Sequence, residues 1–318
     1  MNKPMKKTSI VMLAFLILIL GNLFATFVDV IVKALAADIS VYQYLFFRQI
    51  TVLLMMLPFW LRLSIKQQRP GNIKVHLFRA LMTNIGAPAA VIALLYLPLA
   101  TANVIFYAAP MITLLLAVIL FKEKLTKQRV LVTVLGFAGV AIALRPEYLG
   151  IAGLLAFCTA IAVAAYNLSV KWLPKGSSTV NTIFWSNLFA IPLIGLIAAF
   201  NWQPITQELI ILSIGSCVCL VAYQGCCIIA FQKADASAIA VAEYSGLIFA
   251  AGLGWLLFNE SIDLWTFIGI ALIVLPIIWQ SWREHRLEFA NNQPTLLIEQ
   301  PGAHAEFTSL DSQEVKSD

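Results

Sequence analysis

The sequence predicts an all-α integral membrane protein with ten transmembrane helices, arranged as two inverted five-helix repeats. Of the 318 residues, 61% are hydrophobic and only 12% are charged, about half the charged fraction that is usual in a soluble domain. The apolar runs supply about ten segments near the 20 residues that cross a bilayer. Three landmarks also recur at one offset of 137 residues, where Tyr107, Phe121 and Glu123 correspond to Tyr244, Phe258 and Glu260.

The apolar runs define the expected helices in chain order. The first half contains five, at residues 9–35, 41–61, 78–97, 101–121 and 130–146. The second half contains five more, at residues 150–170, 179–200, 208–230, 238–258 and 264–282. Because five is an odd number, the second repeat (150–282) is expected to be inverted relative to the first (9–146). Residues 283–318 have too few apolar side chains to bury a core, and we expect a disordered cytoplasmic tail there.

The basic residues in the connectors predict the orientation. Lys and Arg gather in the connectors on the side of the N-terminus, and the opposite connectors hold only Arg145, apart from Lys33 near the end of the first helix. Cytoplasmic loops carry such an excess. We therefore expect both termini in the cytoplasm, in a cell inner membrane. The net charge of +5 belongs to these loops and does not indicate a nucleic-acid partner.

The sequence offers little for a catalytic, metal or cofactor site. The three histidines, His76, His285 and His304, fall in the expected inner loops or the tail, outside the predicted bundle. The five cysteines lie within apolar runs with no histidine nearby, which favours small buried residues over metal ligands. There is also no phosphate-binding loop of the Gly-x-x-x-x-Gly-Lys type. We expect neither an enzyme nor an ATPase, and no cofactor or metal.

Ionisable residues inside the spans are the first candidates for a substrate pathway, because charge is costly in hydrocarbon. Asp29 and Lys33 are four residues apart on one helix face, where they can neutralise each other. Arg48 lies too deep in its span to be interfacial and needs a partner, either Asp29 or the carboxylate of a substrate. Glu243 has no nearby cation in sequence, so it is protonated, pairs across the bundle or faces a wet cavity. A buried carboxylate with a raised pKa also suits a proton carrier for coupling.

Aromatic and amide side chains complete the expected pathway. Asn103, Tyr107 and Pro110 follow a helical spacing on one face of the span 101–121, and Tyr244 is the repeat partner of Tyr107. Other polar-tipped residues in the spans are either pathway residues or belong to the interfacial aromatic belt: Tyr166, Asn167, Trp185, Tyr223 and Gln224. Glu123 and Glu260 begin polar connectors, and we expect them to mark helix ends by capping or by pairing with adjacent lysines.

Two kinds of motif resemble the EamA family of the drug/metabolite transporter superfamily. Each half ends with an apolar run, a Glu and a Gly-containing last helix: Phe121-Lys-Glu-Lys-Leu through Gly136-Phe-Ala-Gly139, and Gly254-Trp-Leu-Leu-Phe-Asn-Glu260 through Gly269. Further motifs resemble a subgroup with S-adenosylmethionine uptake carriers and riboflavin importers: Phe24-Ala-Thr with Asp29, Val32-Lys33-Ala-Leu, Phe46-Phe47-Arg48 and Glu243-Tyr244. The resemblance covers residues 9–282. The chain departs from it at Lys171-Trp-Leu-Pro-Lys175 and in its 36-residue tail.

The resemblance implies a secondary carrier that moves a small metabolite by alternating access, in contact with membrane lipid. It also implies pathway roles for Asp29, Arg48, Glu243 and Tyr244, to which the residues themselves add Asn103, Tyr107, Tyr166 and Trp185. The aromatic spans favour a substrate with a planar ring. Riboflavin is the first expectation, and S-adenosylmethionine or another amino-acid-like metabolite is the alternative. A membrane sensor or scaffold that transports nothing is the rival from another class.

Overall fold

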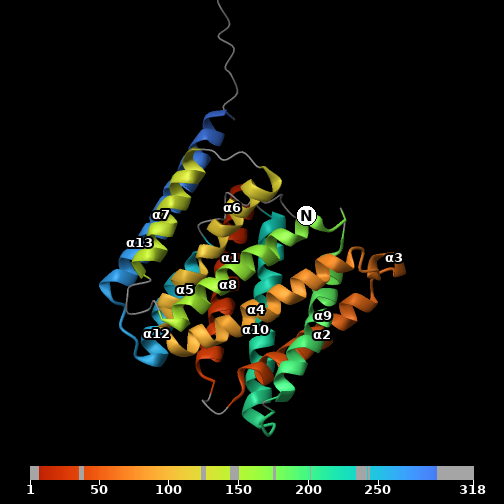
Figure 1. Ribbon diagram of the computed structural model, residues 1–318. Coiled ribbons are helices and arrows are strands. Elements are labelled where there is room, and N and C mark those ends of the chain that lie inside the picture. Colours follow the sequence, from red (N-terminus) through yellow and green to blue (C-terminus); the bar gives the residue numbers. More distant parts are fainter. Residues whose placement is uncertain are drawn as a thin grey trace, which may run out of the picture.

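The computed structural model describes residues 7–35, 39–122, 127–143, 150–174, 177–200, 202–233, 242 and 244–291, and these contain helices and no strand (Figure 1). The first half holds α1 (Lys7–Lys33), α2 (Val41–Leu61), the short α3 (Ile65–Gln68), α4 (Ile73–Tyr96), α5 (Leu99–Phe106), α6 (Ala108–Phe121) and α7 (Lys127–Ala143). The second half holds α8 (Ile151–Leu168), the 3-10 helix η2 (Ser169–Trp172), α9 (Thr179–Phe200), α10 (Gln207–Lys233), α12 (Ser245–Phe258) and α13 (Leu264–Asn291).

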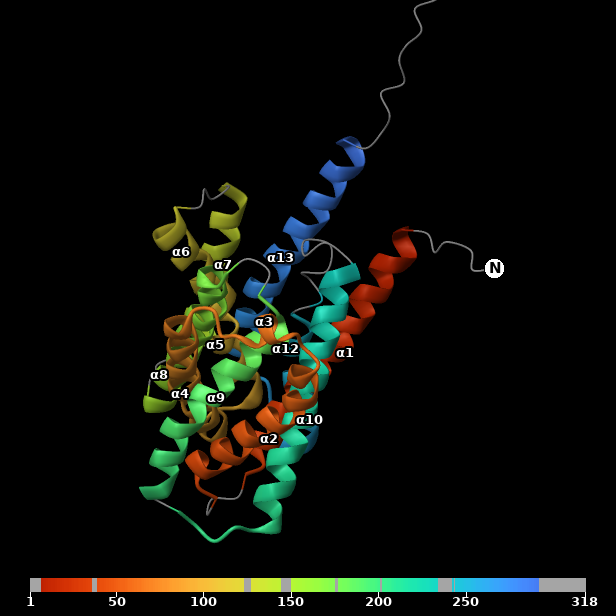
Figure 2. The same cartoon turned by 90° about the vertical axis from the view of Figure 1, so that its right-hand side faces the viewer.

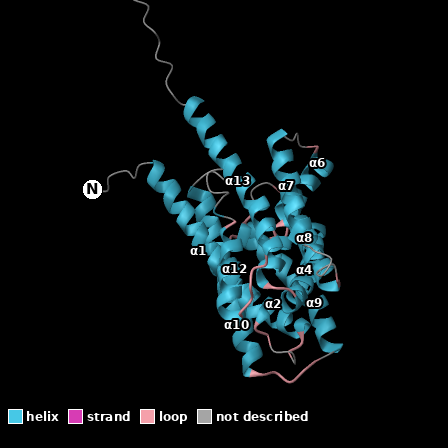
Figure 3. Cartoon of the chain, turned by 90° about the vertical axis from the view of Figure 1, so that its left-hand side faces the viewer, coloured by secondary structure: helices cyan, strands magenta, loops and turns pink. Residues whose placement is uncertain are grey.

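The described helices are those of a multi-pass membrane protein (Figure 3). Seven segments are long and apolar enough to cross a bilayer, with α5 and α6 counted together as one. Three shorter apolar helices, Val130–Ala143, Ser245–Phe258 and Leu264–Trp279, lie at the other expected positions. The all-helical membrane fold is confirmed. The number of ten spans stays a prediction, because the three short helices fall below the usual crossing length.

Two of the expected boundaries are wrong for the same reason. α4 begins at Ile73 and not at residue 78, which places His76 inside a helix rather than in a loop. α13 continues to Asn291, past the expected end of the helix and the expected start of the tail at Arg283, and extends beyond the bundle in Figure 2. An apolar window detects only the part of a helix that lies in hydrocarbon. Charged residues such as Lys, Arg and Glu are good helix formers and continue it outside the bilayer.

The repeat is visible in the backbone itself. α6 and α12 are both 14 residues long, and each begins after a tyrosine in a turn conformation, Tyr107 and Tyr244. Each ends at a residue with positive φ, 52° at Lys122 and 56° at Asn259. All these positions are related by the offset of 137 residues that the landmarks predict. The two halves therefore share a local backbone geometry as well as a sequence pattern.

The expected single helix 101–121 is interrupted, and Pro110 alone does not explain the interruption. The chain turns at Tyr107 between α5 and α6. A proline three residues further on removes one backbone donor from the helical ladder. The second repeat has Leu247 at the equivalent position, and α12 nevertheless starts after the same turn. Discontinuous helices of this kind frequently form the binding sites of transporters, because they free backbone groups at membrane depth.

The two halves interleave. The pairs of helices with the most extensive packing are α1 with α10, α4 with α8, α2 with α9, and α7 with α13. When each helix is replaced by its counterpart in the other half, the α1–α10 pair becomes the α8–α4 pair. The α2–α9 and α7–α13 pairs are converted into themselves. A two-fold relation between the halves produces this pattern. In the α7–α13 pair, a Cβ at Gly139 would lie 2.7 Å from the Gly269 oxygen, so glycine permits the close approach.

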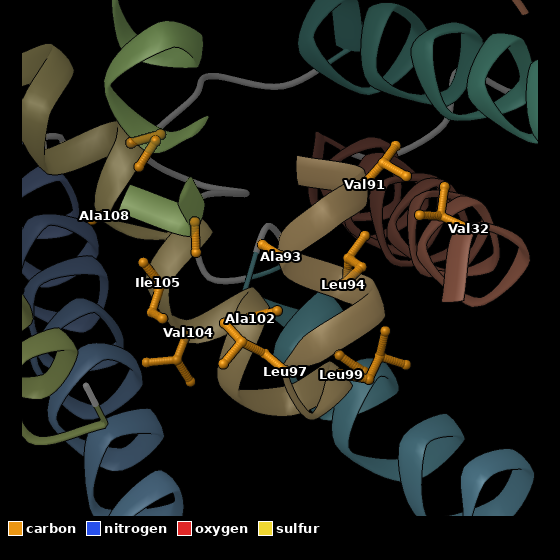
Figure 4. Packing of buried hydrophobic residues seen from close by; sticks show 14 of the residues in the cluster. Val32, Val91, Ala93, Leu94, Leu97, Leu99, Ala102, Val104, Ile105 and Ala108 are labelled. Carbon is orange, nitrogen blue, oxygen red and sulfur yellow. The ribbon is translucent and has the colours of Figure 1, made fainter. Parts of the chain in front are cut away.

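The main apolar core surrounds the turn between α4 and α5 (Figure 4). Leu94 and Leu97 lie before the turn and Leu99 and Ile105 after it, and all four are buried. Val32, from the last turn of α1, belongs to the same cluster. Close packing leaves this corner little freedom. It therefore fixes the end of α4 and the start of α5, from which several polar contacts of the candidate site originate.

Candidate functional site

One face of α1 carries a row of polar residues through the bundle. Asn22, Thr26, Asp29 and Lys33 are spaced by four, three and four positions, so their side chains lie on one side of the helix. We call this set the α1 polar row. Asn22 and Thr26 are 4% and 2% exposed, so the row is buried at that end, and α1 packs against α12 and α5. The candidate site is built along this row.

The middle of the row contacts the first half of the interrupted helix. The Nδ2 atom of Asn103 donates to Oδ2 of Asp29 at 3.0 Å and to the carbonyl oxygen of Leu99 at 3.1 Å. Asn103 is buried, and its bond to Leu99 lies within α5, which orients the amide. The structure thus brings together two residues that the sequence singled out. The other Asp29 oxygen, Oδ1, accepts no hydrogen bond from the described residues.

A cation lies close to Asp29 without pairing with it. Arg48 of α2 is near enough to act on the Asp29 charge, but no Arg48 nitrogen lies within 4.0 Å of the Asp29 carboxylate. The Arg48 guanidinium lies over the Tyr44 ring, 5.8 Å from its centroid. Tyr44 is fully buried, and its hydroxyl has no hydrogen-bond partner among the described residues. Buried polar groups normally have partners, so the Tyr44 hydroxyl is a group to which a ligand could form a hydrogen bond.

At the end of α1, Lys33 binds the other half of the protein. Its Nζ atom forms an ion pair with Oε1 of Glu260 at 2.7 Å, and both side chains are largely buried. The same atom donates to the carbonyl oxygens of Leu94 at 3.1 Å and Leu97 at 2.5 Å. The expected pairing of Lys33 with Asp29 is wrong in this conformation. A long lysine side chain extends toward the end of its helix, where the carboxylate of Glu260 and two free carbonyls lie.

The second carboxylate oxygen of Glu260 contacts the start of α5. Its Oε2 atom accepts the Leu99 backbone N–H at 2.7 Å, which is a free donor at the start of α5. Gly254 leaves room for the carboxylate, because a Cβ there would lie 2.9 Å from Oε2. The pocket that Glu260 lines has a volume of only about 10 Å³, no more than one water needs. Glu260 therefore pairs with Lys33 from the first helix and not with an adjacent lysine.

The two repeat-related tyrosines meet. The rings of Tyr107 and Tyr244 lie 5.4 Å apart between centroids and are tilted by 34°. Gly246 makes this possible, because a Cβ there would collide with the Tyr107 hydroxyl. The Nδ2 atom of Asn22 donates to the same segment, to the Ala242 carbonyl oxygen at 2.7 Å and to the Ser245 hydroxyl oxygen at 3.1 Å. The α1 polar row thus contacts α5 in the first repeat and the start of α12 in the second.

Tyr166 and Trp185 make their described contacts elsewhere. The Tyr166 ring lies under the guanidinium of Arg79, 3.7 Å from it, and the Tyr166 carbonyl accepts from Arg79 at 2.8 Å. Trp185 donates to the Gln68 carbonyl at 2.8 Å and stacks on Phe189. These contacts support the connectors of α2–α4 and α8–α9. Glu243 and Glu123, the remaining acidic candidates, lie outside the described residues.

Sequence reasoning missed several residues of the site. Asn22, Thr26 and Tyr44 were not candidates, and Glu260 was expected only to mark a helix end. The spacing of polar residues on α1 was the available signal, because it continues the face of Asp29 and Lys33 by two turns. His76 was placed in a loop. It is buried in α4, with Nε2 2.8 Å from the Pro70 oxygen and Nδ1 3.3 Å from the Ser186 hydroxyl.

The chain has clear similarity to known proteins. The model of the EamA-like transporter family matches it twice, over residues 12–145 and 150–282. It is 31% identical over 256 residues to an S-adenosylmethionine uptake transporter of Rickettsia bellii (strain RML369-C), covering 78% of this chain and 86% of that one. It is 28% identical over 243 residues to a riboflavin transporter of Vibrio cholerae serotype O1, covering 74% and 82%.

A more distant relative and a solved structure extend the comparison. The chain is 24% identical over 273 residues to a pseudopaline exporter of Pseudomonas aeruginosa, covering 83% of this chain and 94% of that one. A solved crystal structure superposes with a TM-score of 0.53 at 18% sequence identity, covering 88% of this chain and 99% of that one. The likeness to the crystal structure concerns the fold alone.

Proposed function

Because this chain belongs to the EamA-like transporter family, we propose that it is a secondary carrier that takes up a small zwitterionic metabolite across the inner membrane by alternating access. Membership of the family makes it a membrane transporter. The mechanism without ATP, the direction of transport and the class of substrate are the content of the proposal. The orientation with both termini in the cytoplasm is part of it.

The contact between Lys33 and Glu260 supports alternating access. Lys33 belongs to the first half and Glu260 to the second, so their ion pair joins the halves at one end of the bundle. In the proposed orientation this is the periplasmic end, because α1 starts in the cytoplasm. The Leu99 N–H and the carbonyls of α4 complete the closure. Opening this end requires the charges to separate, and rehydration offsets much of that cost.

The observation that carries the substrate class is the separation of Asp29 from Arg48. A carboxylate and a guanidinium lie near each other on two helices, they form no direct ion pair, and Oδ1 of Asp29 accepts nothing from the described residues. We propose that a substrate with an ammonium and a carboxylate group binds here, the ammonium toward Asp29 and the carboxylate toward Arg48. Arginine suits this role because its planar fork matches a carboxylate.

S-adenosylmethionine meets this requirement better than riboflavin does. It carries an α-ammonium, a carboxylate and a cationic sulfonium, together with a planar adenine. Riboflavin has neither an ammonium nor a carboxylate. The relatives at 31% identity and 28% identity are named for these two substrates in the same order. The adjacent tyrosines Tyr107 and Tyr244 suit a planar ring in either case, and they keep riboflavin as the second candidate.

Transport by the purified full chain in proteoliposomes tests the proposal. We expect saturable uptake of labelled S-adenosylmethionine and none of labelled riboflavin. Asp29→Asn and Arg48→Gln should each reduce uptake about tenfold or more, since hydrogen bonds to charged groups contribute about 1.5–3 kcal/mol. Glu208→Gln and Lys74→Gln are matched controls, because these side chains are exposed, and they should transport normally.

Each other outcome has a definite meaning. Saturable riboflavin uptake without S-adenosylmethionine uptake would make the ranking of substrates wrong and leave the carrier intact. Equal losses in Asp29→Asn and Glu208→Gln would contradict the zwitterion site. No saturable flux of either substrate, with folded protein in the membrane, would contradict the proposal and favour the sensor or scaffold.

A further inference from the structure

A second buried cation, Arg79 of α4, lies apart from the α1 polar row. It is 3% exposed, and buried charges in proteins are normally paired with an opposite charge. Arg79 has no carboxylate partner in the described part of the chain, where the ion pair is that of Lys33 with Glu260. Its acceptors are all neutral: the Ser186 hydroxyl at 3.0 Å, the Tyr166 carbonyl at 2.8 Å and the Ser169 hydroxyl at 3.1 Å. No carboxylate among the described residues therefore balances the charge of Arg79.

The bonding pattern leaves one side of the guanidinium available. A guanidinium has five N–H donors. The Nε atom of Arg79 donates to Ser186, and Nη1 donates to the two acceptors at the end of α8. The Tyr166 ring covers one face of the group, at 3.7 Å. The third nitrogen, Nη2, donates to no acceptor among the described residues. The contacts of Nε, Nη1 and the ring face nevertheless fix the position of the guanidinium.

Arg79 lines a cavity of about 370 Å³ between α4, the start of α9 and the connector that follows α8. Lys171 lines the same cavity, so both charged residues in its wall are positive. The remaining polar wall consists of hydroxyl-bearing residues, Ser177, Thr179 and Thr182. This combination of a fixed guanidinium, an ammonium and hydroxyl groups is the donor set that binds phosphate in proteins.

All charged residues in the two segments that surround the cavity are basic. Residues 62–79 and 169–179 contain no Asp or Glu and hold seven basic side chains between them: Arg62, Lys66, Arg69, Lys74, Arg79, Lys171 and Lys175. Trp172, in the cavity's own connector, is 42% exposed and packs edge-on against Phe78. Exposed tryptophan beside apolar spans is typical of the headgroup level of a membrane, and in the proposed orientation this is the cytoplasmic leaflet.

We propose that this cavity binds an anionic phosphate group, presented by a phospholipid headgroup of the cytoplasmic leaflet. Nη2 of Arg79 and the Lys171 ammonium neutralise the phosphate. Basic pockets between membrane helices on this side of a bilayer bind anionic headgroups. Occupancy joins α4 of the first half to the α8–α9 connector of the second. None of the residues that line this cavity belongs to the α1 polar row, and the binding test requires no transport substrate.

Thermal unfolding of the purified full chain in micelles of a neutral detergent measures this binding. We expect phosphatidylglycerol to raise the Tm in a saturable way and phosphatidylcholine with the same acyl chains to leave it unchanged. Lys171→Gln should weaken the apparent affinity for phosphatidylglycerol about fivefold, the usual effect of one basic residue at a membrane surface. Lys74→Gln removes the same charge from an exposed position on α4 and should retain the wild-type affinity.

Two further ligands identify the source of the phosphate. Inorganic phosphate and glycerol 3-phosphate, added without lipid, should not raise the Tm at concentrations where phosphatidylglycerol saturates. If they raise it as strongly and Lys171→Gln weakens the effect, the site takes a free phosphate and the lipid assignment is overturned. Equal stabilisation by phosphatidylcholine, or equal weakening by Lys74→Gln and Lys171→Gln, would overturn the site itself.

Discussion

Lys33 and Arg79 are both largely buried cations, yet the protein satisfies them in different ways. Lys33 pairs with the carboxylate of Glu260 from the opposite half. Arg79 donates to two hydroxyls and a carbonyl and rests on an aromatic ring. A lysine is a point charge on a flexible chain, whereas an arginine is a rigid fork with five donors. The difference indicates a contact that can open at the Lys33 end and a fixed support at Arg79.

Removal of the fixed support should have the largest effect. Arg79→Met leaves the acceptors on Tyr166, Ser169 and Ser186 without their donor, and several hydrogen bonds to a charged group are lost at once. We expect a loss of about 3 kcal/mol or more in the free energy of unfolding, measured as a lower Tm in detergent. Lys74→Gln on the same helix should change the Tm little. A Tm within the error of wild type would show that Arg79 supports nothing.

Removal of one charge at the Lys33 end should have a smaller and more local effect. Glu260→Gln is nearly isosteric and can still accept from the Leu99 N–H, but it leaves Lys33 with only carbonyl partners. We expect this end to open more often, with thiol labelling of a cysteine introduced at the buried Thr101 about tenfold faster, as a weakening of about 1.4 kcal/mol would give.

The control for that measurement is Glu208→Gln, since Glu208 is an exposed acid at the start of α10. It should leave the labelling rate at Thr101→Cys unchanged. The same rate in Glu260→Gln and in the control would contradict the role of the ion pair in closing this end.

A single methyl group should reproduce part of that opening. Gly254→Ala places a Cβ 2.9 Å from Oε2 of Glu260 and 3.3 Å from Cβ of Leu99, so the carboxylate must move. We expect a loss of about 1–2 kcal/mol of stability, typical of overpacking, and faster labelling at the same reporter position. Gly252→Ala is the matched control, because a Cβ there meets nothing within 4 Å. Equal Tm values for the two variants would argue against a tight fit at Gly254.

The smallest expected effect distinguishes the two roles of Tyr166. Its contacts with Arg79 use the ring face and the backbone carbonyl, neither of which needs the hydroxyl. Tyr166→Phe should therefore change stability by less than about 0.5 kcal/mol and leave uptake intact, whereas Tyr166→Leu should lose about 1 kcal/mol with the cation–π contact. Loss of substrate uptake in Tyr166→Phe, with an unchanged Tm, would restore Tyr166 to the substrate pathway.

Much of the fold could be predicted because it depends on local composition. Apolar runs of bilayer length produce helices wherever they occur, since a backbone in hydrocarbon must satisfy its own hydrogen bonds. The offset of 137 residues between Tyr107 and Tyr244 was predictable in the same way, and the two tyrosines precede helices of equal length. The ends of α4 and α13 were not, because hydrophobicity marks where the membrane ends and not where a helix does.

The candidate site was predictable as a set of residues and not as a set of contacts. Asp29, Arg48 and Asn103 stood out because polar groups are costly in an apolar span. Asn22 and Tyr44 did not, since neither is ionised in the span and neither shares the helical spacing that singled out Asn103, Tyr107 and Pro110. The predicted partner of Lys33 was wrong because helical spacing identifies only neighbours one turn away on the same helix. The observed partner, Glu260, lies 227 positions further along the chain.

The sequence by itself determined that this protein is helical, crosses a membrane and is built from a duplicated unit, because these properties follow from composition and periodicity. The tertiary structure decided which charges meet. It placed Glu260 beside Lys33, left Asp29 and Arg48 apart, and turned Arg79 toward neutral acceptors beside a basic cavity. The physical reason is that an ion pair needs its atoms within a few ångströms, and only the packing of one half against the other sets those distances.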